Sequence, residues 1–101
     1  MWIFAMFDLP VKAKPDRKEY TRFRKALLRE GFNMLQYSVY ARHCTSEDDA
    51  NAYARRLSHL LPPKGQIRLL QVTDRQFGKM EVFLGANRAP TEEPPQQLML
   101  F

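Results

Sequence analysis

An aromatic-rich apolar run lies at the start of the chain, and it ends abruptly at a polar residue. The run, Trp2 to Phe7, contains no charged side chain and is followed by Asp8, Leu9 and Pro10. Its length suits a central β-strand that leads into a loop, and it falls far short of the ~20 residues that a membrane-spanning helix requires. No basic segment precedes the run, so it does not match a secretory signal peptide. We therefore expect a soluble, cytoplasmic protein whose sheet is built around this strand.

The size, charge and cysteine content of the chain indicate what kind of protein it is. With 101 residues it has the size of one domain, and so short a chain gains stability from further burial in an oligomer. Lysine and arginine number 16 against 11 acidic residues, and the net charge of +5 favours a polyanionic partner. The single cysteine, Cys44, excludes an intrachain disulfide and suits a reducing compartment. Cys44, His43 and His59 do not have the spacing of a zinc site, so we expect them to be structural or on the surface.

The first helix is expected to carry much of the positive charge. Pro15 marks its start and Gly31 its end. Tyr20, Phe23 and Leu27 recur at three- and four-residue spacing, which predicts an apolar stripe that faces a core. The remaining surface of this helix is basic, which favours a nucleic-acid partner; its cations are Arg17, Lys18, Arg22, Arg24, Lys25 and Arg29.

The rest of the chain predicts three more strands and one more helix. Strands are expected at 33–42, 66–73 and 77–84, because these segments are rich in apolar, aromatic and β-branched residues. A cluster of capping residues at 45–49 starts the second helix, which ends at Pro62. Taken literally, the order of elements is βαβαββ. A βαββαβ order requires the long second strand or the last pair of strands to be counted differently, and the residues alone leave both orders open.

Two helices can cover one face of such a sheet, so the other face needs a partner. In the expected strand 66–73, Ile67 and Leu69 point to one face while Leu70 and Val72 point to the other. Both faces of this strand are therefore expected to be buried. A second copy of the chain covers the open face most simply, which predicts a sheet-to-sheet homodimer.

The chain is expected to divide into three segments. Residues 1–84 form the folded domain, and residues 85–96, which contain three of the seven prolines, form an extended tail. Residues 97–101 are too short to fold alone and are expected to add as an edge strand, within one subunit or between two. These five residues also look like the peptide that bacterial replication proteins insert into the sliding clamp. A clamp-recruited DNA-binding protein is therefore one alternative.

Several short motifs fall between residues 2 and 84: Phe7-Asp8-Leu9-Pro10, Glu30-Gly31-Phe32, Gln36-Tyr37-Ser38-Val39-Tyr40, Lys64-Gly65 and Thr73-Asp74-Arg75-Gln76-Phe77. Together they resemble the CRISPR-associated Cas2 family, and most closely its type II members. The resemblance implies an α+β, ferredoxin-like βαββαβ sandwich with an extra C-terminal strand, which dimerises through its sheets. It also implies a role in CRISPR adaptation, in which the homodimer bridges two dimers of the Cas1 integrase around a prespacer DNA duplex. Some members of the family are metal-dependent nucleases.

The resemblance matches the metal-binding aspartate of the family to Asp8. From the residues alone, an aspartate before Leu-Pro is also typical of a turn cap, because its carboxylate readily accepts hydrogen bonds from backbone amides. One carboxylate holds Mg²⁺ poorly, so two Asp8 side chains across a dimer axis would share one ion, with water completing the octahedron. Such an ion would polarise a phosphoryl oxygen and activate water. A metal-dependent endoribonuclease or endodeoxyribonuclease is therefore a second alternative.

Contacts to nucleic acid are expected from the first helix and from the second strand. Ser38 could contact a phosphate, although an alternating strand needs some polar residue in any case. Tyr37 and Tyr40 are assigned to packing, because aromatic residues of strands mostly belong to the core. Contacts to a duplex backbone, without reading of the bases, are expected from Arg17, Arg22, Arg24, Lys25 and Arg29.

Overall fold

The structure is a computed structural model that describes residues 1–95, which form three helices and six strands. In chain order the elements are β1 (Trp2–Asp8), α1 (Lys14–Arg29), β2 (Asn33–Gln36), β3 (Val39–His43), α2 (Glu47–Ser58), β4 (Gln66–Val72), α3 (Asp74–Gly78), β5 (Val82–Leu84) and β6 (Asn87–Ala89). Within residues 1–95, none of the helices combines the length and the apolar character needed to cross a bilayer. The edge strand and the clamp peptide expected at 97–101 lie outside the described residues.

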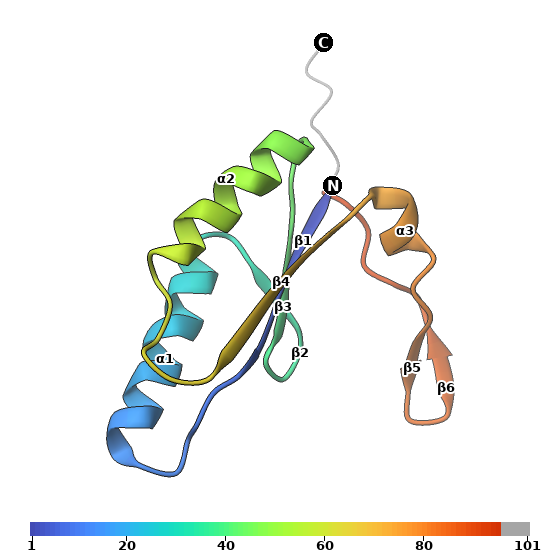
Figure 1. The fold of residues 1–101 in the computed structure, drawn as a ribbon. Coiled ribbons are helices and arrows are strands. Elements are labelled where there is room, and N and C mark those ends of the chain that lie inside the picture. Colours follow the sequence, from blue (N-terminus) through green and yellow to red (C-terminus); the bar gives the residue numbers. More distant parts are fainter. Residues whose placement is uncertain (96–101) are drawn as a thin grey trace.

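A four-stranded antiparallel sheet with the strand order β2-β3-β1-β4 lies at the centre of the molecule (Figure 1). β1 is a central strand, as expected: its Ala5 pairs with Tyr40 of β3 on one side and with Leu69 of β4 on the other. The first six elements follow the order βαββαβ, so the literal βαβαββ order is wrong. The α+β fold is compatible with the ferredoxin-like arrangement that the resemblance implied.

A tight turn at Tyr37 and Ser38 divides the strand expected at 33–42 into β2 and β3. Ser38 has a φ of 63°, a left-handed conformation that glycine or asparagine usually supplies. The carbonyl of Ser38 accepts a hydrogen bond from the backbone N–H of Phe7 over 3.0 Å, which fastens the turn to the end of β1. Because the turn contains neither glycine nor proline, the sequence pattern indicates one continuous strand there.

The fourth strand expected at 77–84 is largely wrong, because its first residues belong to α3 and the turn that follows it. Thr73 caps this helix: its hydroxyl accepts a hydrogen bond from the N–H of Gln76, whose side chain accepts one from the N–H of Thr73. Phe77 is buried, and its ring stacks on Trp2 with 3.9 Å between the ring centroids. What remains of the expected strand is the short β5, which pairs with β6, a strand inside the segment expected as an extended tail.

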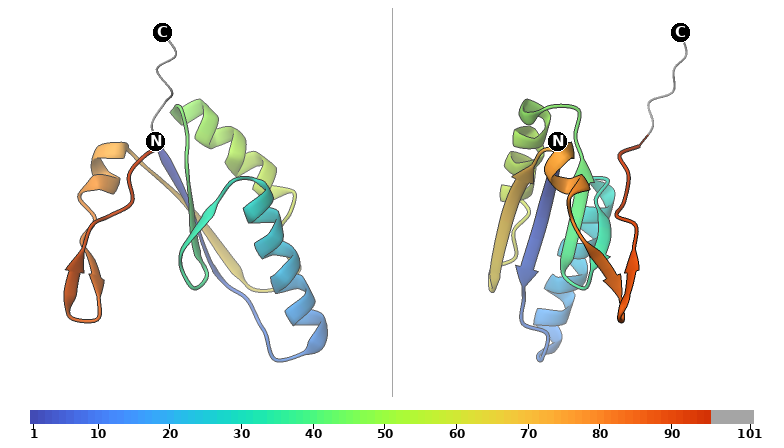
Figure 2. Two further views of the ribbon diagram at one scale, coloured as in Figure 1. Left: turned by 180° about the vertical axis from the view of Figure 1, so that it is seen from behind. Right: turned by 90° about the vertical axis from the view of Figure 1, so that its right-hand side faces the viewer.

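The two long helices cover one face of the sheet, and α3 and the β5–β6 hairpin lie on the other side (Figures 1 and 2). Ile3, Ala5 and Phe7 of β1 point toward the long helices, where they pack with Phe23 of α1 and Leu57 of α2. All five side chains are buried, and burial of each large apolar side chain contributes about 1.5–3 kcal/mol. The apolar stripe predicted for the first helix faces this core.

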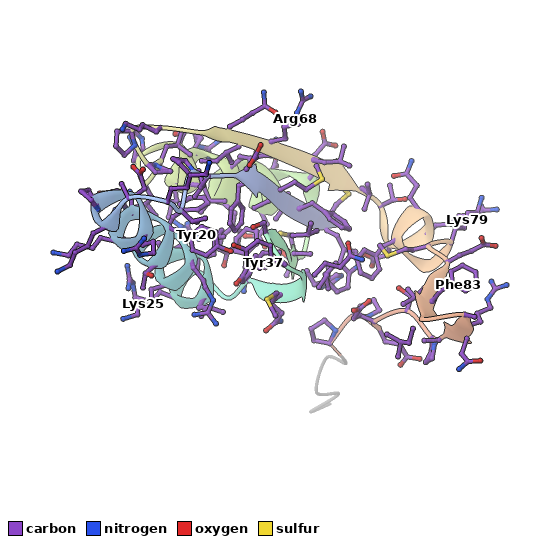
Figure 3. The ribbon with its side chains drawn as sticks, turned by 90° about the horizontal axis from the view of Figure 1, so that it is seen from below. Tyr20, Lys25, Tyr37, Arg68, Lys79 and Phe83 are labelled. Carbon is purple, nitrogen blue, oxygen red and sulfur yellow. The ribbon has the colours of Figure 1, made fainter. Side chains whose placement is uncertain are left out.

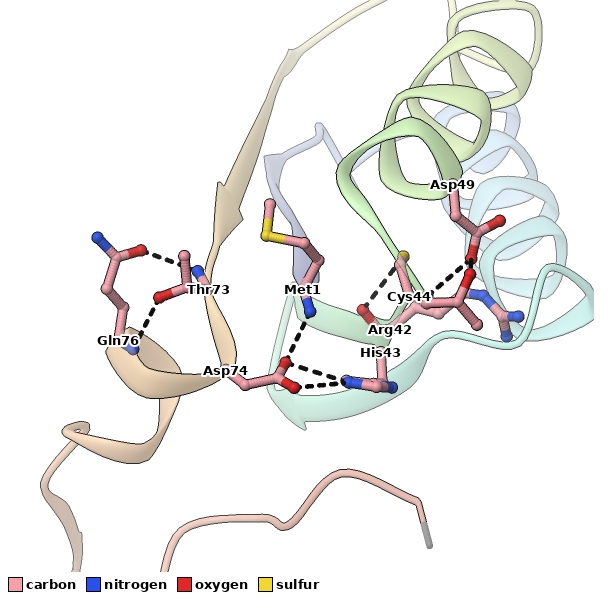
Figure 4. Close-up of polar contacts among 9 residues, drawn as sticks. Met1, Arg42, His43, Cys44, Asp49, Thr73, Asp74 and Gln76 are labelled. Carbon is pink, nitrogen blue, oxygen red and sulfur yellow. Dashed lines mark hydrogen bonds and ion pairs between the residues drawn. The ribbon is translucent and has the colours of Figure 1, made fainter. Parts of the chain in front are cut away.

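A polar cluster holds α3 beside the start of the chain (Figure 4). The amino group of Met1 donates a hydrogen bond to the carboxylate of Asp74 over 2.7 Å, and Nε2 of His43 lies 3.1 Å from the same carboxylate. These contacts, first the hydrogen bond from the Met1 amino group, lower the pKa of Asp74. The neighbouring Cys44 is buried, and burial raises the pKa of its thiol. His43 and Cys44 therefore serve the fold, as expected.

The second face of the sheet is only partly covered. Near α3 it is buried, but Leu70 of β4 is 48% exposed, and Phe83 and Leu84 of the hairpin are 54% and 71% exposed. Between the sheet and the hairpin lies a groove of about 480 Å³, lined by Phe4, Leu35, Gln36, Val39, Met80, Glu81, Val82, Phe83, Leu84 and Glu92. Leu69, which points toward the helices, is also 37% exposed. Burial of both faces of β4, as expected from the sequence, is thus not reached within a single chain.

Candidate functional site

β1 ends at Asp8, whose side chain is exposed. Side chains alternate along a strand, so Asp8 lies on the second, partly open face together with Met6. Within residues 1–95 the Asp8 carboxylate takes part in no hydrogen bond and no ion pair, so it does not cap the turn that follows. An exposed carboxylate without a protein partner is available to a ligand.

A glycine turn packs directly against the backbone of Asp8. Asp8 pairs with Gln66 at the start of β4, and Gly65 precedes that strand with a φ of 93°. A Cβ atom at Gly65 would lie 2.6 Å from the carbonyl oxygen of Asp8 and 2.6 Å from a side-chain carbon of Leu9. Both distances are shorter than a van der Waals contact, so only glycine allows this approach. The turn thereby fixes the main chain from which the Asp8 carboxylate projects.

Two tyrosines stack beside the turn that joins β2 to β3. The rings of Tyr20 and Tyr37 are 5.8 Å apart and inclined by 17° (Figure 3). The hydroxyl of Tyr20 shares a hydrogen bond of 3.2 Å with that of Ser38, and it also raises the pKa of the neighbouring Tyr37. Tyr40 is buried in the core, so its assignment to packing is confirmed, whereas the same assignment is wrong for Tyr37, which is 71% exposed.

The five basic residues expected to contact nucleic acid fall into two groups. Arg17 donates a hydrogen bond of 2.6 Å to the carbonyl of Lys12 and so braces the loop before α1. Arg22 donates to the carboxylate of Glu19 and to the carbonyl of Leu60, which ties α1 to the loop before β4. All five are exposed, and Lys25 projects from the outer side of α1 (Figure 3). Those without a partner among residues 1–95 are Arg24, Lys25 and Arg29.

Two polar side chains of β4 lie on the same face as Asp8, and sequence reasoning missed them. Gln66 pairs with Asp8 and Arg68 pairs with Met6, so all four side chains share a face of the sheet. Nε of Arg68 donates a hydrogen bond of 3.2 Å to Oε1 of Gln66. The period-two alternation that places Leu70 on one face also places Arg68 and Gln66 there, so the signal was present in the sequence.

No group of three or more histidine, cysteine, aspartate or glutamate side chains within residues 1–95 could hold a metal ion. Mg²⁺ prefers six oxygen ligands, usually including one or two carboxylates. Asp8 offers one such carboxylate in each chain.

Comparison with known proteins identifies the family. A family model described as CRISPR associated protein Cas2 matches residues 1–80. The CRISPR-associated endoribonuclease Cas2 of Parvibaculum lavamentivorans is 50% identical over 101 residues, which cover the whole of both chains. Proteins of the same name from Flavobacterium psychrophilum and Paracidovorax avenae are 45% and 44% identical; the match covers all of this chain and 88% and 94% of theirs. The chain therefore belongs to the CRISPR-associated Cas2 family.

Proposed function

We propose that this protein is a scaffold of CRISPR adaptation: a cytoplasmic homodimer that binds a prespacer duplex and bridges two dimers of the Cas1 integrase. The observation that carries the proposal is the set of exposed cations on α1 without a partner among residues 1–95, in a chain of net charge +5: Arg24, Lys25 and Arg29, with Lys14 and Lys18. Exposed cations on one helix can neutralise successive phosphates without reading the bases. Membership of the Cas2 family supports the same role.

The open face of the sheet supports the homodimer. A two-stranded hairpin is marginally stable by itself, yet β5 exposes Phe83 and Leu84, which line the groove between the hairpin and the sheet. β4 is an edge strand of the sheet, and Leu70 lies exposed on the same face. A second copy brings a matching apolar face, so a twofold dimer covers both open faces at once. Such a dimer also brings the two Asp8 side chains to the shared face.

Binding to nucleic acid is tested by a gel-shift assay with a prespacer-like duplex and the cognate integrase. We expect the double variant Arg24→Gln/Lys25→Gln to bind weakly, because it lacks two phosphate contacts. A matched control, Arg75→Gln/Lys79→Gln, removes the same charge from α3 and from the residue that follows it, and both of these cations are also exposed. The control should bind like the wild type. Equal weakening of duplex binding in both variants would show that binding depends on net charge alone. It would exclude α1 as the interface.

The dimer is tested by sedimentation of the purified protein over a range of concentrations. Leu84→Ser should shift the population toward monomer, because this side chain is 71% exposed beside the groove. Leu28→Ser is the matched control: Leu28 is 43% exposed, but it lies on α1, away from the open face. A monomeric wild type, or equal dissociation of both variants, contradicts the proposed interface.

A second candidate function is metal-dependent cleavage of a phosphodiester, and the free Asp8 carboxylate favours it. Across the proposed dimer axis, two Asp8 carboxylates together with water would satisfy Mg²⁺, which would supply polarisation of a phosphoryl oxygen. Similar proteins named as endoribonucleases lend this candidate support. The two candidates rest on different observations: the scaffold on the exposed cations of α1, and the nuclease on the one carboxylate that each chain offers at the end of β1.

The substitution Asp8→Asn separates the two roles. If the protein is a nuclease, cleavage of RNA or DNA requires Mg²⁺ and is lost in Asp8→Asn, while the dimer and duplex binding persist. Cleavage that persists in Asp8→Asn excludes Asp8 as the metal ligand. Spacer integration that is normal with Asp8→Asn shows that the scaffold works without this chemistry.

A further inference from the structure

A surface hollow of about 340 Å³ lies where the end of α1 meets β3 and α2, away from Asp8 and from the open face of the sheet. It is lined by Arg29, Glu30, Gly31, Arg42, Tyr53 and Arg56. Three of these six residues are arginines and one is acidic. The hollow therefore concentrates positive charge at a place where three elements distant in sequence converge.

The ring of Tyr53 organises the guanidinium groups. The central carbons of the Arg42 and Arg56 guanidinium groups each lie 4.2 Å from its centroid, within the range of cation–π attraction. The ring itself packs edge-to-face on Phe32, which is buried, with 6.3 Å between the centroids. Both guanidinium groups are thus held against the same aromatic ring, and an anion in the hollow would offset part of the positive charge that they bring there.

Gly31 leaves room for the side chain of Arg42. A Cβ atom on Gly31 would lie 2.1 Å from Nη1 of Arg42, so the guanidinium occupies the space that any other side chain would need. Gly31 also has a φ of 83°, which is a second reason why this position favours glycine. The side chain of Arg42 is therefore set against the main chain of Gly31 rather than free in solvent.

Arg42 has no hydrogen-bond acceptor among the described residues. Its Nε is buried without a partner, and its guanidinium donates no hydrogen bond to residues 1–95. Arg56, in contrast, donates a hydrogen bond of 2.7 Å to Glu30, the one carboxylate that lines the hollow. Nε is enclosed by protein, whereas the Nη atoms of Arg42 also lack an acceptor among residues 1–95 and are the donors that a ligand in the hollow would meet.

We propose that this hollow binds a phosphate group of the nucleic-acid backbone. A guanidinium presents planar, paired N–H donors that match the oxygens of a phosphate, and the three arginines exceed the one carboxylate by two charges. Arg29 belongs both to the hollow and to the basic face of α1, so a strand lying along α1 would reach it. The inference rests on the proposed function, because it takes its ligand from the same nucleic acid.

The anion site is tested first with inorganic phosphate alone. In nuclear magnetic resonance spectra of the full chain, phosphate should shift the Nε–H signal of Arg42 and the ring signals of Tyr53 along a saturable curve. Sodium chloride at equal ionic strength is the control and should leave these signals in place. The absence of a saturable shift at these two residues overturns the site.

The nucleic-acid ligand is tested with a matched pair of variants. Arg56→Gln removes an arginine that lines the hollow, and Arg55→Gln removes the neighbouring exposed arginine, which does not line it. Duplex binding is measured over a series of salt concentrations. For Arg56→Gln we expect the slope of log K against log salt to fall by about one, the loss of one phosphate contact, and for Arg55→Gln an unchanged slope.

The outcomes separate this inference from the proposed function. If the wild type binds no duplex, the proposed function fails, and so does the assignment of the hollow to nucleic acid, even where inorganic phosphate binds. If the wild type binds the duplex but both variants have the same slope, the proposed function stands and the hollow is not part of the interface. A hollow that takes inorganic phosphate without any effect of Arg56→Gln on the duplex then serves another anion, such as an acidic segment of a protein.

Discussion

The amino group of Met1 and the carboxylate of Asp74 lie 2.7 Å apart, although 73 positions separate the two residues in sequence. The contact joins the start of β1 to the start of α3, and His43 approaches the same carboxylate. These polar contacts therefore hold the start of the chain against α3, beside the stacked rings of Trp2 and Phe77.

Asp74→Asn should destabilise the protein at neutral pH and have little effect in acid. The pKa of Asp74 is lowered, first by the hydrogen bond from Met1, so the unfolded chain binds the proton more readily than the folded one. The stabilisation is present above the ordinary carboxyl value of about 4 and is lost as the pH falls through the lowered pKa. Because the side chain is half exposed, we expect up to about 1 kcal/mol. Urea unfolding at pH 7 and pH 3 measures this loss of stability. If the free energies of unfolding of wild type and variant differ by the same amount at both pH values, the ion pair is not the source of the loss.

Gly65→Ala should cost more than Gly85→Ala, although both glycines have a positive φ. At Gly85 a new Cβ meets no atom within 4 Å, so we expect the cost of the left-handed backbone alone, about 1–2 kcal/mol. At Gly65 the clash with the backbone of Asp8 adds about 1–3 kcal/mol. The free energies of unfolding in urea give the comparison, and equal losses would show that the turn does not press on Asp8.

Ser38→Gly should be more stable than Ser38→Ala by about 1 kcal/mol. Both variants lose the hydrogen bond between the Ser38 and Tyr20 hydroxyls, but glycine adopts the φ of 63° without the strain that alanine keeps. Adding Tyr20→Phe to either variant should then cost little, since the shared hydrogen bond is already absent. Thermal unfolding of the four proteins checks both statements; a more stable alanine variant would contradict the left-handed turn.

Phe77→Ala should destabilise the fold by about 3–5 kcal/mol, because a buried ring stacked on Trp2 is lost and a cavity remains. Phe83→Ala removes the same atoms from a side chain that is 54% exposed, so its effect on the unfolding of a monomer should be small. Both are measured at low protein concentration, to keep association out of the result. Similar losses in the two variants would mean that Phe77 of α3 does not stabilise the buried part of the second face, where Trp2, Phe4 and Ala41 are also buried.

Much of the fold was predictable from local patterns, and the failures have particular causes. The apolar run gave β1, and the spacing of Tyr20, Phe23 and Leu27 gave the buried side of α1. The β2–β3 turn was not predicted because Ser38 adopts a conformation that is usual for glycine or asparagine. α3 was not predicted because five residues are too few to show a helical spacing of apolar residues. Thr73 and Gln76 do match the pattern of a capping box.

Less of the candidate site than of the fold could be predicted from the sequence. The position of Asp8 at the end of β1 was predictable, because a polar residue closes the apolar run. The division of the cations on α1 was not, since the contacts of Arg22 with Leu60 depend on where the chain returns after α2. Tyr37 was misjudged because aromatic character predicts burial only where a neighbouring element covers the ring.

The alternation along β1 has a consequence for how substitutions would be tolerated in a living cell. Ile3, Ala5 and Phe7 serve the interior beneath the long helices, whereas Met6 and Asp8 face the side left for a partner or a ligand. In a saturation screen of this strand, the first set should lower the cellular abundance of the protein. The second set should leave abundance nearly intact and weaken the binding of a partner or a ligand instead, so that two kinds of defect would alternate from Ala5 to Asp8.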